Sequence, residues 1–347
     1  MKILALETTC DETAAAIVEA GDSSGSPIQV LGSVVASQTD LHVEFKGVVP
    51  EIAARAHVER ILPVIHRTVE RSGVEIGELD AIAVANTPGL SGSLIVGLMA
   101  AKALCLALDK PLIAVNHLHA HIYACQLGCQ GSIYPCVGMI VSGGHSHLYR
   151  FDDPLNAHYL GGTIDDAAGE AFDKVAVMLG LDYPGGPEIS RIAQMGDETA
   201  WSFPRSFISE QRLDFSFSGI KTAVRYAIAG PGKTNFDDVV LDSKQAADLA
   251  ASFQAAVVDC LVAKAMQAIQ QTGLRQLCVG GGVAANRRFR IQLDKACRDA
   301  QVNLHIAPTD LCTDNAVMGA IAVERYRAGL FESLDLDIAP GLVRVSR

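Results

Sequence analysis

The 347 residues of the chain include 28 basic and 39 acidic side chains, which gives a formal net charge of −11. Neutralising phosphates supplies most of the affinity of unaided nucleic-acid binders, so this charge argues against tight, unaided binding to a polynucleotide. The charge does not exclude a local basic strip, or a partner protein that binds the nucleic acid. With 49% hydrophobic and 19% charged residues, the chain can bury a large core, and its length favours two domains over one.

The nine cysteines form no Cys-x-x-Cys pair and show no framework spacing, as is typical of reduced thiols in a cytosolic protein. The N-terminus reaches an acidic residue at Glu7, too early for the apolar core of a signal peptide. The longest apolar stretch, at about residues 93–108, falls short of a bilayer span and contains Lys102. We therefore expect a cytoplasmic protein without membrane segments.

The first part of the chain has the element order of an α/β unit with a mixed sheet. A helix is predicted to begin at Pro50, to carry Glu51 in its first turn and to end at Gly73. The predicted elements, in order, are strands at 2–8, 13–20 and 28–37, a helix at 50–72, a strand at 79–86, a helix at 93–108 and a strand at 111–117.

A similar order restarts near residue 134, where two strands flank a Gly-Gly turn. Later segments predict a strand, a triple-glycine turn and a helix within 275–297, then a last strand and a last helix at 314–330. We predict two related halves, 1–130 and 131–347, with the last helix packing near the first half. The second half is predicted to carry a turn-rich insertion at about 153–240.

Three histidines stand within five residues, directly after the predicted strand at 111–117. If a helix begins near Asn116, His117 and His121 lie one turn apart on one face and can share a metal, while His119 points elsewhere. The alternative is a helix start in which the imidazoles bond to loop carbonyls.

A metal site needs a third ligand. Asp314 follows the last strand at the start of the last helix, where it could equally be an N-cap, a role for which Asp310 competes. Cys125 and Cys129 continue the histidine spacing but fall along an apolar helix, which favours buried thiols. Two histidines and one carboxylate leave coordination positions open, which suits a metal that binds substrate oxygen.

Glycine-rich turns follow two apolar strands, at 141–146 and 279–286. Backbone N–H groups can approach a phosphate closely at such turns. Together with the glycines at 185–186, they predict a nucleotide cleft.

The first turn, by contrast, contains no glycine, although ATPases that hold a polyphosphate there usually have one. Asp11 and Glu12 in this turn would repel a triphosphate but could accept a proton from an amine. The alternative is that both are solvated turn acids.

The second half contains two further polar segments. One predicted helical stretch carries Asp165, Asp166, Glu170 and Asp173, of which Asp173 has apolar neighbours and is the best candidate for a ribose hydroxyl. Residues 212–225 interleave basic side chains with two phenylalanines, which indicates either contact with nucleic acid or a strand packed on the core.

These pieces together resemble the tRNA adenosine threonylcarbamoyltransferase family, whose members were once described as O-sialoglycoprotein endopeptidases. The resemblance runs in register from about residue 3 to residue 330. It implies the fold shared by actin, Hsp70 and sugar kinases. The motifs that carry it include ETTCDETAAAI, NHLHAHI, VSGGHSHL, DDAAGEAFDK, LGLDYPGGP, LDFSFSGIKT, GGGVAANRRFR and CTDNAVMGA.

The resemblance implies that His117, His121 and Asp314 bind one divalent metal, iron above all, with zinc or manganese as alternatives. Many members have Glu-Gly between the histidines, whereas this chain has His119-Ala120, which leaves the role of His119 open. The position of Glu188 helps bind substrate in some relatives. The residues implied for the adenylate are Ile140, Val141, Ser142, Gly143, Gly144, Asp173, Gly186 and Asn286.

The implied reaction moves threonylcarbamoyl from threonylcarbamoyl-AMP to the adenosine beside the anticodon of tRNAs that read codons beginning with A. We hypothesise that Asp11 or Glu12 accepts the proton of the amine. The resemblance also implies a complex with a paralogous subunit of the same fold and a small ATPase. Helices 50–72 and 92–108 are candidates for the paralogue contact, with ordinary packing on the sheet as the alternative.

Other functions fit less well. Zinc peptidases need His-Glu-x-x-His, and Leu118 stands where the glutamate would be. The glycine-free first turn disfavours a small-molecule kinase, and the intact ligand set disfavours a non-enzymatic scaffold.

Overall fold

The structure is a computed structural model that describes residues 1–23, 25–230 and 241–341. Its contacts divide the chain into two compact units. The first comprises Met1–Tyr134, Asp152–Ala157 and the segment from Ala307 onward, and the second comprises Pro135–Phe151 and His158–Ile306.

The sheet of the first unit has the strand order β3-β2-β1-β4-β5. Strand β1 pairs antiparallel with β2 and parallel with β4, so the sheet is mixed. Its strands are β1 Lys2–Glu7, β2 Glu12–Ala20, β3 Ile28–Ser37, β4 Ala81–Thr87 and β5 Leu112–Asn116.

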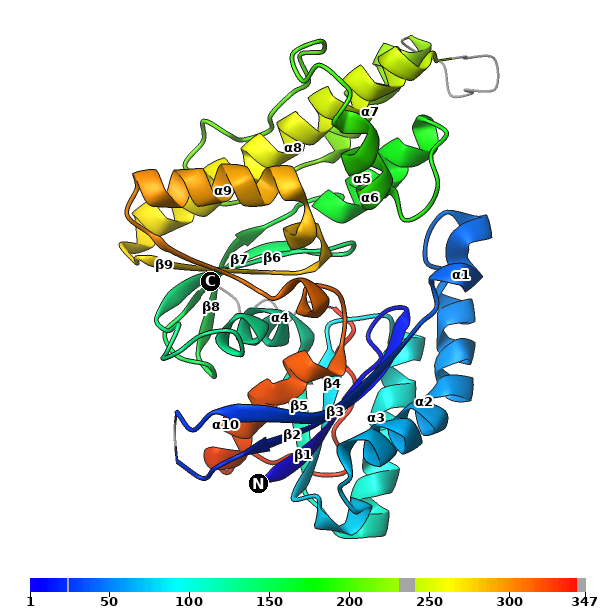
Figure 1. The fold of residues 1–347 in the computed structure, drawn as a ribbon, viewed down its shortest axis with the longest axis vertical. Coiled ribbons are helices and arrows are strands. Elements are labelled where there is room, and N and C mark those ends of the chain that lie inside the picture. The colour runs from blue at the N-terminus through cyan, green and yellow to red at the C-terminus, as the bar shows by residue number, and fades with distance from the viewer. Residues whose placement is uncertain (24, 231–240, 342–347) are drawn as a thin grey trace. The chain divides into compact units, whose positions relative to one another are not determined.

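Both faces of this sheet are covered. Helices α2 and α3 lie on one face and α10 on the other (Figure 1). Because no face is left to water, β1 is buried from Ile3 to Glu7 rather than alternating. Each fully buried Leu or Ile contributes roughly 1.5–3 kcal/mol, which makes this sheet a rigid base for side chains at its strand ends. The helices are α1 Thr39–His42, α2 Pro50–Ser72, α3 Ser91–Leu108, α4 His117–Gln126 and α10 Ala322–Arg327, and the short 3-10 helices are η1 Val43–Phe45, η2 Ile76–Glu78, η4 Thr309–Leu311 and η5 Ala316–Ile321.

The sheet of the second unit repeats the arrangement in the order β10-β9-β6-β7-β8. In each sheet the first strand pairs antiparallel with the next strand and parallel with a later one: β1 with β2 and β4, and β6 with β7 and β9. A further strand then pairs in parallel with that later strand, β5 with β4 and β10 with β9. The predicted fold class, two α/β halves of similar order, is therefore confirmed. The strands are β6 Cys136–Val141, β7 Ser146–Phe151, β8 Ala157–Gly162, β9 Gln276–Gly280 and β10 Asn303–Ile306.

The segment predicted as a turn-rich insertion contains a strand, β8, and three helices, while its last residues, 231–240, lie outside the described residues. The 30-residue helix α8, which packs with α9, is not among the elements predicted from the sequence. The helices of this unit are α5 Ala168–Met178, α6 Gly185–Ala193, α7 Ser218–Ala229, α8 Ser243–Thr272 and α9 Arg287–Asp299, with the 3-10 helix η3 at Gly282–Ala285.

Among the described residues, α3 and α8 are long and apolar enough to cross a membrane by length and composition. Helix α8 is mostly buried inside its unit, and the inward face of α3 packs on the sheet core. Both are explained as helices of a folded α/β protein.

Candidate functional site

The histidine segment forms the first turn of α4, directly after β5. Asn116 caps this helix, because its side-chain oxygen accepts hydrogen bonds from the backbone N–H groups of Leu118 and His119 at 2.9 and 3.2 Å. The cap confirms a helix start at Asn116. It brings the rings of His117 and His121 onto one face, with their centroids 4.7 Å apart.

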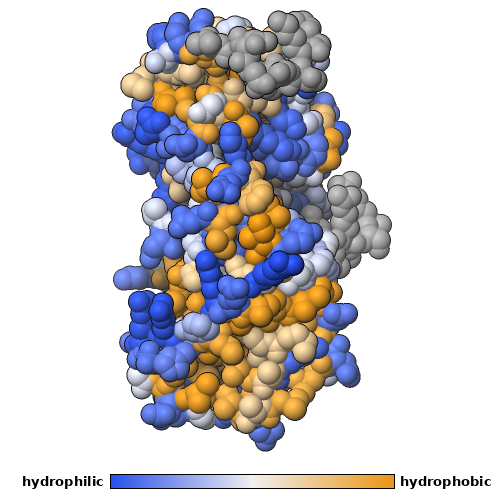
Figure 2. All heavy atoms as spheres, turned by 90° about the vertical axis from the view of Figure 1, so that its right-hand side faces the viewer, coloured by the Kyte–Doolittle hydropathy of each residue, from blue (hydrophilic) through white to orange (hydrophobic). Residues whose placement is uncertain are grey.

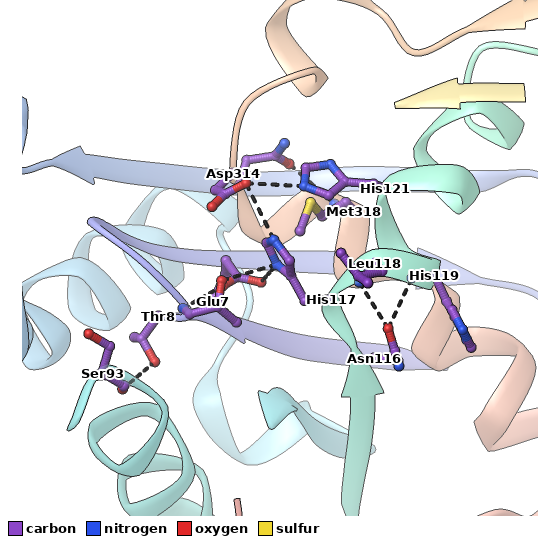
Figure 3. A network of polar contacts seen from close by, with 12 residues as sticks. Glu7, Thr8, Ser93, Asn116, His117, Leu118, His119, His121, Asp314 and Met318 are labelled. Atoms are coloured by element: carbon purple, nitrogen blue, oxygen red, sulfur yellow. Dashed lines mark hydrogen bonds and ion pairs between the residues drawn. The ribbon is translucent and has the colours of Figure 1, made fainter. Parts of the chain in front are cut away.

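Asp314 meets these histidines from the C-terminal part of the chain (Figure 3). Its Oδ1 atom lies 3.1 Å from Nε2 of His121 and 3.5 Å from Nε2 of His117. One ligand atom from each residue falls within 4.8 Å of the other two. Both imidazoles are buried, so the three side chains form an enclosed cluster of two nitrogens and a carboxylate.

Asp314 is available for this role because it does not cap a helix. Asn315 takes the cap of η5, its side chain accepting from the N–H of Met318 at 3.2 Å. The predicted last helix therefore begins later than expected, and the reading of Asp314 as an N-cap is wrong. Asp310 lies in η4, another short helix, and is exposed.

The surroundings of His117 suit a cation. Its Nδ1 atom lies 3.0 Å from Oε2 of Glu7 and 3.1 Å from the hydroxyl of Thr9, which directs Nε2 toward Asp314. Burial alone would lower the pKa of His117, but Glu7 and Asp314 outweigh it and raise the pKa to about 9. Negative charge that holds a proton on this ring would also hold a metal ion.

His121 supplies the second nitrogen of the cluster. Its Nε2 atom faces Asp314 at 3.1 Å, whereas its buried Nδ1 atom has no hydrogen-bond partner among the described residues. Two imidazole nitrogens with one carboxylate oxygen match the ligand preferences of a first-row divalent metal. The residues present therefore fit such an ion.

His119 lies on a different side of α4 and points away from Asp314 in Figure 3. Burial, with a smaller contribution from the positive charge of Arg325, lowers the pKa of His119 to about 4. The ring is therefore neutral at physiological pH and stands outside the ligand cluster. Cys125 is a buried thiol, as expected.

Of the two acids proposed from the sequence, Asp11 ends the turn between β1 and β2 and Glu12 is the first residue of β2. Burial, followed by repulsion from Asp314 and Asp11, raises the pKa of Glu12 to about 10. Burial and Asp11 likewise raise the pKa of Cys10 well above its ordinary value, so this thiol is not an activated nucleophile. The turn thus combines an acid cluster with an inert thiol.

The second unit holds the residues expected to contact a nucleotide. Ile140 and Val141 are buried in β6, and the turn that follows packs on the start of α5. The N–H groups of Gly169 and Glu170 donate to the carbonyls of Ser142 and Gly143, both at 3.1 Å. A Cβ atom on Gly169 would lie 2.6 Å from the Ser142 oxygen, so glycine permits this close contact. Gly143 and Gly144 themselves face open space.

Asp173 organises a neighbouring loop. Its Oδ1 atom accepts from the N–H of Gly185 at 2.8 Å, which ties the start of α6 to α5. Gly186 has open space around its Cα atom. Glu188 pairs with Arg191 of its own helix at 2.6 Å and is only partly exposed.

Asn286 has a structural role as well. It caps α9 by accepting from the N–H of Phe289 at 3.0 Å, and its amide donates to Ser190 and Gln254 at 2.9 and 2.8 Å. Sequence reasoning missed Ser190 and Gln254. A buried glutamine in the middle of an apolar helix was the available signal for Gln254, since buried amides need partners.

The structure corrects one further prediction and decides between two alternatives for another segment. Asp165 and Asp166 precede α5 rather than lying on it: Asp165 accepts from Ser216 and Ser218, and Asp166 pairs with two lysines. The phenylalanines at 215 and 217 are buried and stack on each other, so they belong to the core and not to a nucleic-acid surface.

The sequence of the chain is similar to those of known proteins over nearly its whole length. A family model described as tRNA N6-adenosine threonylcarbamoyltransferase matches residues 29–321. The protein of that name from Rhodopirellula baltica is 55% identical over 353 aligned residues, covering 99% of this chain and 97% of the relative. The one from Syntrophobacter fumaroxidans is 48% identical, covering 97% of this chain and 98% of the relative.

Solved structures with a similar fold are much more distant in sequence. Full-length HypF in its phosphate- and nucleotide-bound form aligns with a TM-score of 0.62 at 14% identity, covering 95% of this chain and 47% of HypF. The activator of 2-hydroxyisocaproyl-CoA dehydratase from Clostridium difficile aligns with a TM-score of 0.52 at 13% identity, covering 95% and 96%. These likenesses are of fold alone.

Proposed function

The chain belongs to the tRNA N6-adenosine threonylcarbamoyltransferase family and is a transferase that modifies tRNA, and we propose the following substrates and residue roles for it. The donor is threonylcarbamoyl-AMP, and the acceptor is the exocyclic amine of the adenosine next to the anticodon in tRNAs that read codons beginning with A. The amine forms a bond to the carbamoyl carbon, the bond from that carbon to the AMP oxygen breaks, and AMP leaves.

We assign His117, His121 and Asp314 as ligands of one divalent metal ion, with iron as the first candidate. When bound, such an ion supplies Lewis-acid polarisation of a donor oxygen. Glu7 orients the His117 ring through its contact with Nδ1, as carboxylates commonly do for metal-binding histidines. The clustering of these ligands in a chain of this family is the observation that supports the assignment.

Asp11 or Glu12 receives the proton that the amine loses. The donor is an activated mixed anhydride, so no covalent nucleophile is needed, which agrees with the inert thiol of Cys10. Burial and the charges of Asp314 and Asp11 raise the pKa of Glu12 to about 10, so Glu12 can accept a proton only when a bound cation offsets these charges. Replacing each acid by Ala should reduce turnover of preformed donor and leave donor binding intact; normal turnover in both variants would remove this role.

In the second unit, we assign the turn from Ser142 to Gly144 and the loop held by Asp173 to the adenylate. The open space at Gly143, Gly144 and Gly186 supports a close approach of a ligand to the backbone. Asn286 contributes by capping α9 and by joining that helix to α6 and α8.

The partner surface proposed from the sequence is an apolar face on the first unit. Figure 2 shows apolar side chains gathered over α2 and α3. Five large ones are exposed, at i,i+4 spacing on α2 and i,i+4 and i,i+7 spacing on α3: Val58, Leu62, Ile95, Met99 and Leu106. Contiguous apolar surface of this kind marks interaction sites. We propose that it binds a paralogous subunit of the same fold, in a cytoplasmic complex that also contains a small ATPase.

A reconstituted reaction tests the function. The protein is incubated with its partner subunits, threonine, bicarbonate, ATP and unmodified tRNA, and digested nucleosides are analysed by mass spectrometry. Adenosine carrying threonylcarbamoyl is the expected product. Asp314→Asn should abolish it, whereas Asp310→Asn, a change at an exposed acid nearby, should not. Absence of the product with the wild-type complex would refute the proposed function.

A further inference from the structure

Helix α2 contains a buried histidine, His57, that belongs to no metal-ligand cluster among the residues that the structure describes. His57 is fully buried and lies on the side of α2 that faces the β1–β2 turn. Its Nε2 atom is 3.0 Å from the carbonyl oxygen of Cys10, and its Nδ1 atom is 2.8 Å from the hydroxyl of Thr13. The side-chain nitrogen of Gln38 lies 3.3 Å from the same Nδ1 atom.

These contacts fix the tautomer of the ring. A carbonyl oxygen can only accept, so Nε2 carries the hydrogen and donates it to Cys10. In a neutral imidazole, Nδ1 is then the acceptor for Thr13 or Gln38. Burial lowers the pKa of His57 and outweighs the opposing effects of the Cys10 carbonyl, Glu7 and Asp11, which agrees with a neutral ring.

The backbone group that His57 contacts directly precedes the two acidic residues, Asp11 and Glu12. The Cys10 carbonyl belongs to the peptide group that joins Cys10 to Asp11, and Glu12 follows. A displacement of this peptide group would shift the Cα atom of Asp11, and with it the backbone that carries both carboxyl groups. The hydrogen bond to the Cys10 carbonyl therefore helps to hold Asp11 and Glu12 in place.

Helix α3 holds the same turn from its N-terminal end. Ser93 Oγ also donates to the Cys10 carbonyl, at 3.3 Å, and the N–H of Leu90 donates to the Thr9 carbonyl at 2.8 Å. Thr8 Oγ1 donates to the Ser93 carbonyl at 2.9 Å (Figure 3). Among these donors to Cys10, His57 makes the shorter bond and is the one that comes from α2.

We propose that His57 is a positioning residue for the transfer reaction: by donating from Nε2 to the Cys10 carbonyl, it holds Asp11 and Glu12 in the orientation that proton acceptance requires. The inference rests on the proposed function of these acids. Misplacing a catalytic group by about 1 Å can cost on the order of 100-fold in rate, so a buried hydrogen bond outside the site can control turnover.

Two amide substitutions distinguish the roles of the two ring nitrogens, because each places an amide nitrogen at the position of one of them. In His57→Gln the amide nitrogen takes the place of Nε2 and can still donate to Cys10. In His57→Asn the amide nitrogen takes the place of Nδ1 and cannot reach that carbonyl. Each variant is assembled with the partner subunits and assayed with preformed threonylcarbamoyl-AMP and tRNA.

We expect His57→Gln to retain kcat within about threefold and His57→Asn to lose roughly 10–100-fold, with KM for the donor unchanged in both. Metal content, measured by elemental analysis, should match the wild type. His158→Asn, at an exposed position on β8 in the second unit, is the control and should have wild-type kcat. Equal kcat in the Gln and Asn variants, or a loss confined to KM, would overturn the proposal.

Two measurements keep the inference testable if His57→Asn does not fold. Ser93→Ala removes the other donor to the Cys10 carbonyl and should lower kcat about fivefold at constant KM; wild-type kcat there would contradict the proposal. Nitrogen-15 NMR of the His57 ring should show hydrogen on Nε2, without any need for turnover. If the wild-type complex fails to modify tRNA although the NMR spectrum shows this tautomer, the proposed function is refuted, whereas the hydrogen bond between His57 and Cys10 is supported.

Discussion

Oε2 of Glu7 lies 3.0 Å from Nδ1 of His117, on the opposite side of the imidazole from Asp314. Both side chains are buried, and the second carboxylate oxygen of Glu7 accepts from the N–H of Thr9 at 2.7 Å. Glu7 ends β1, so the central strand of the sheet directly supports the proposed ligand cluster.

Glu7→Gln should weaken metal binding by about 10–100-fold, because the amide has nearly the same shape but no charge to strengthen the imidazole as a ligand. Competition with a chelator measures the affinity. Glu78→Gln, at an exposed ion pair with Lys2, is the control. Wild-type affinity in Glu7→Gln would show that the carboxylate does not tune the ligand.

The triple-glycine turn offers a matched pair of substitutions. Gly281 has φ +96°, and a Cβ atom there would lie 2.4 Å from the Val141 carbonyl oxygen. Gly282 has open space. Gly281→Ala should lower the free energy of unfolding by roughly 1–3 kcal/mol or more, and Gly282→Ala should change it little. Urea denaturation of both variants checks this, and equal stabilities would be inconsistent with the close backbone contact.

Asp166 should make stability depend on pH. Burial alone would raise its pKa, but ion pairs with Lys221 and Lys174 at 2.6 and 2.9 Å outweigh it, and the pKa falls below its ordinary value of 3.8. A carboxyl with a lowered pKa in the folded state stabilises the protein above its unfolded pKa, and this stabilisation is lost as pH falls through the folded value.

Asp166→Asn should therefore reduce stability most near neutral pH, and its unfolding free energy should approach that of the wild type below about pH 4. Urea denaturation between pH 3 and 7 provides the measurement. Asp299→Asn, at an exposed position at the end of α9, should track the wild type at every pH. A constant difference between Asp166→Asn and the wild type would rule out titration of Asp166 as the cause.

Leu62→Glu should weaken assembly with the proposed paralogous subunit. The Leu62 side chain is 67% exposed on α2, so a charge there should leave the fold intact and disrupt an apolar contact, weakening association on the order of tenfold or more. Analytical ultracentrifugation with the purified partner measures it. Met195→Glu, at a position 68% exposed in the second unit, should associate normally.

Local sequence was sufficient to predict the arrangement of the two histidines, because it depends on a single helical turn. Asn116 and the i,i+4 spacing of His117 and His121 predict a capped helix with both rings on one face, as the structure has it. Asp314 could not be found in this way. It lies 193 residues after His121, and only the resemblance to a family distinguished it from Asp310. The local difference is that Asn315 takes the cap.

Other elements escaped prediction for physical reasons. Helix α8 is buried over most of its surface, so its apolar residues follow no 3.6-residue stripe and give no amphipathic signal. The role of His57 depends on the carbonyl of a residue 47 positions earlier. No spacing rule reports such a contact, since it arises from packing α2 against the sheet.

The distance in sequence between the proposed metal ligands also sets the order in which they are synthesised. A nascent chain carries both histidines while 193 residues still separate the second of them from Asp314. At about 5–20 residues per second, Asp314 is added to the chain roughly 10–40 seconds after His121. Any product terminated before residue 314 lacks that carboxylate, so a prematurely ended polypeptide cannot form the proposed site of three ligands.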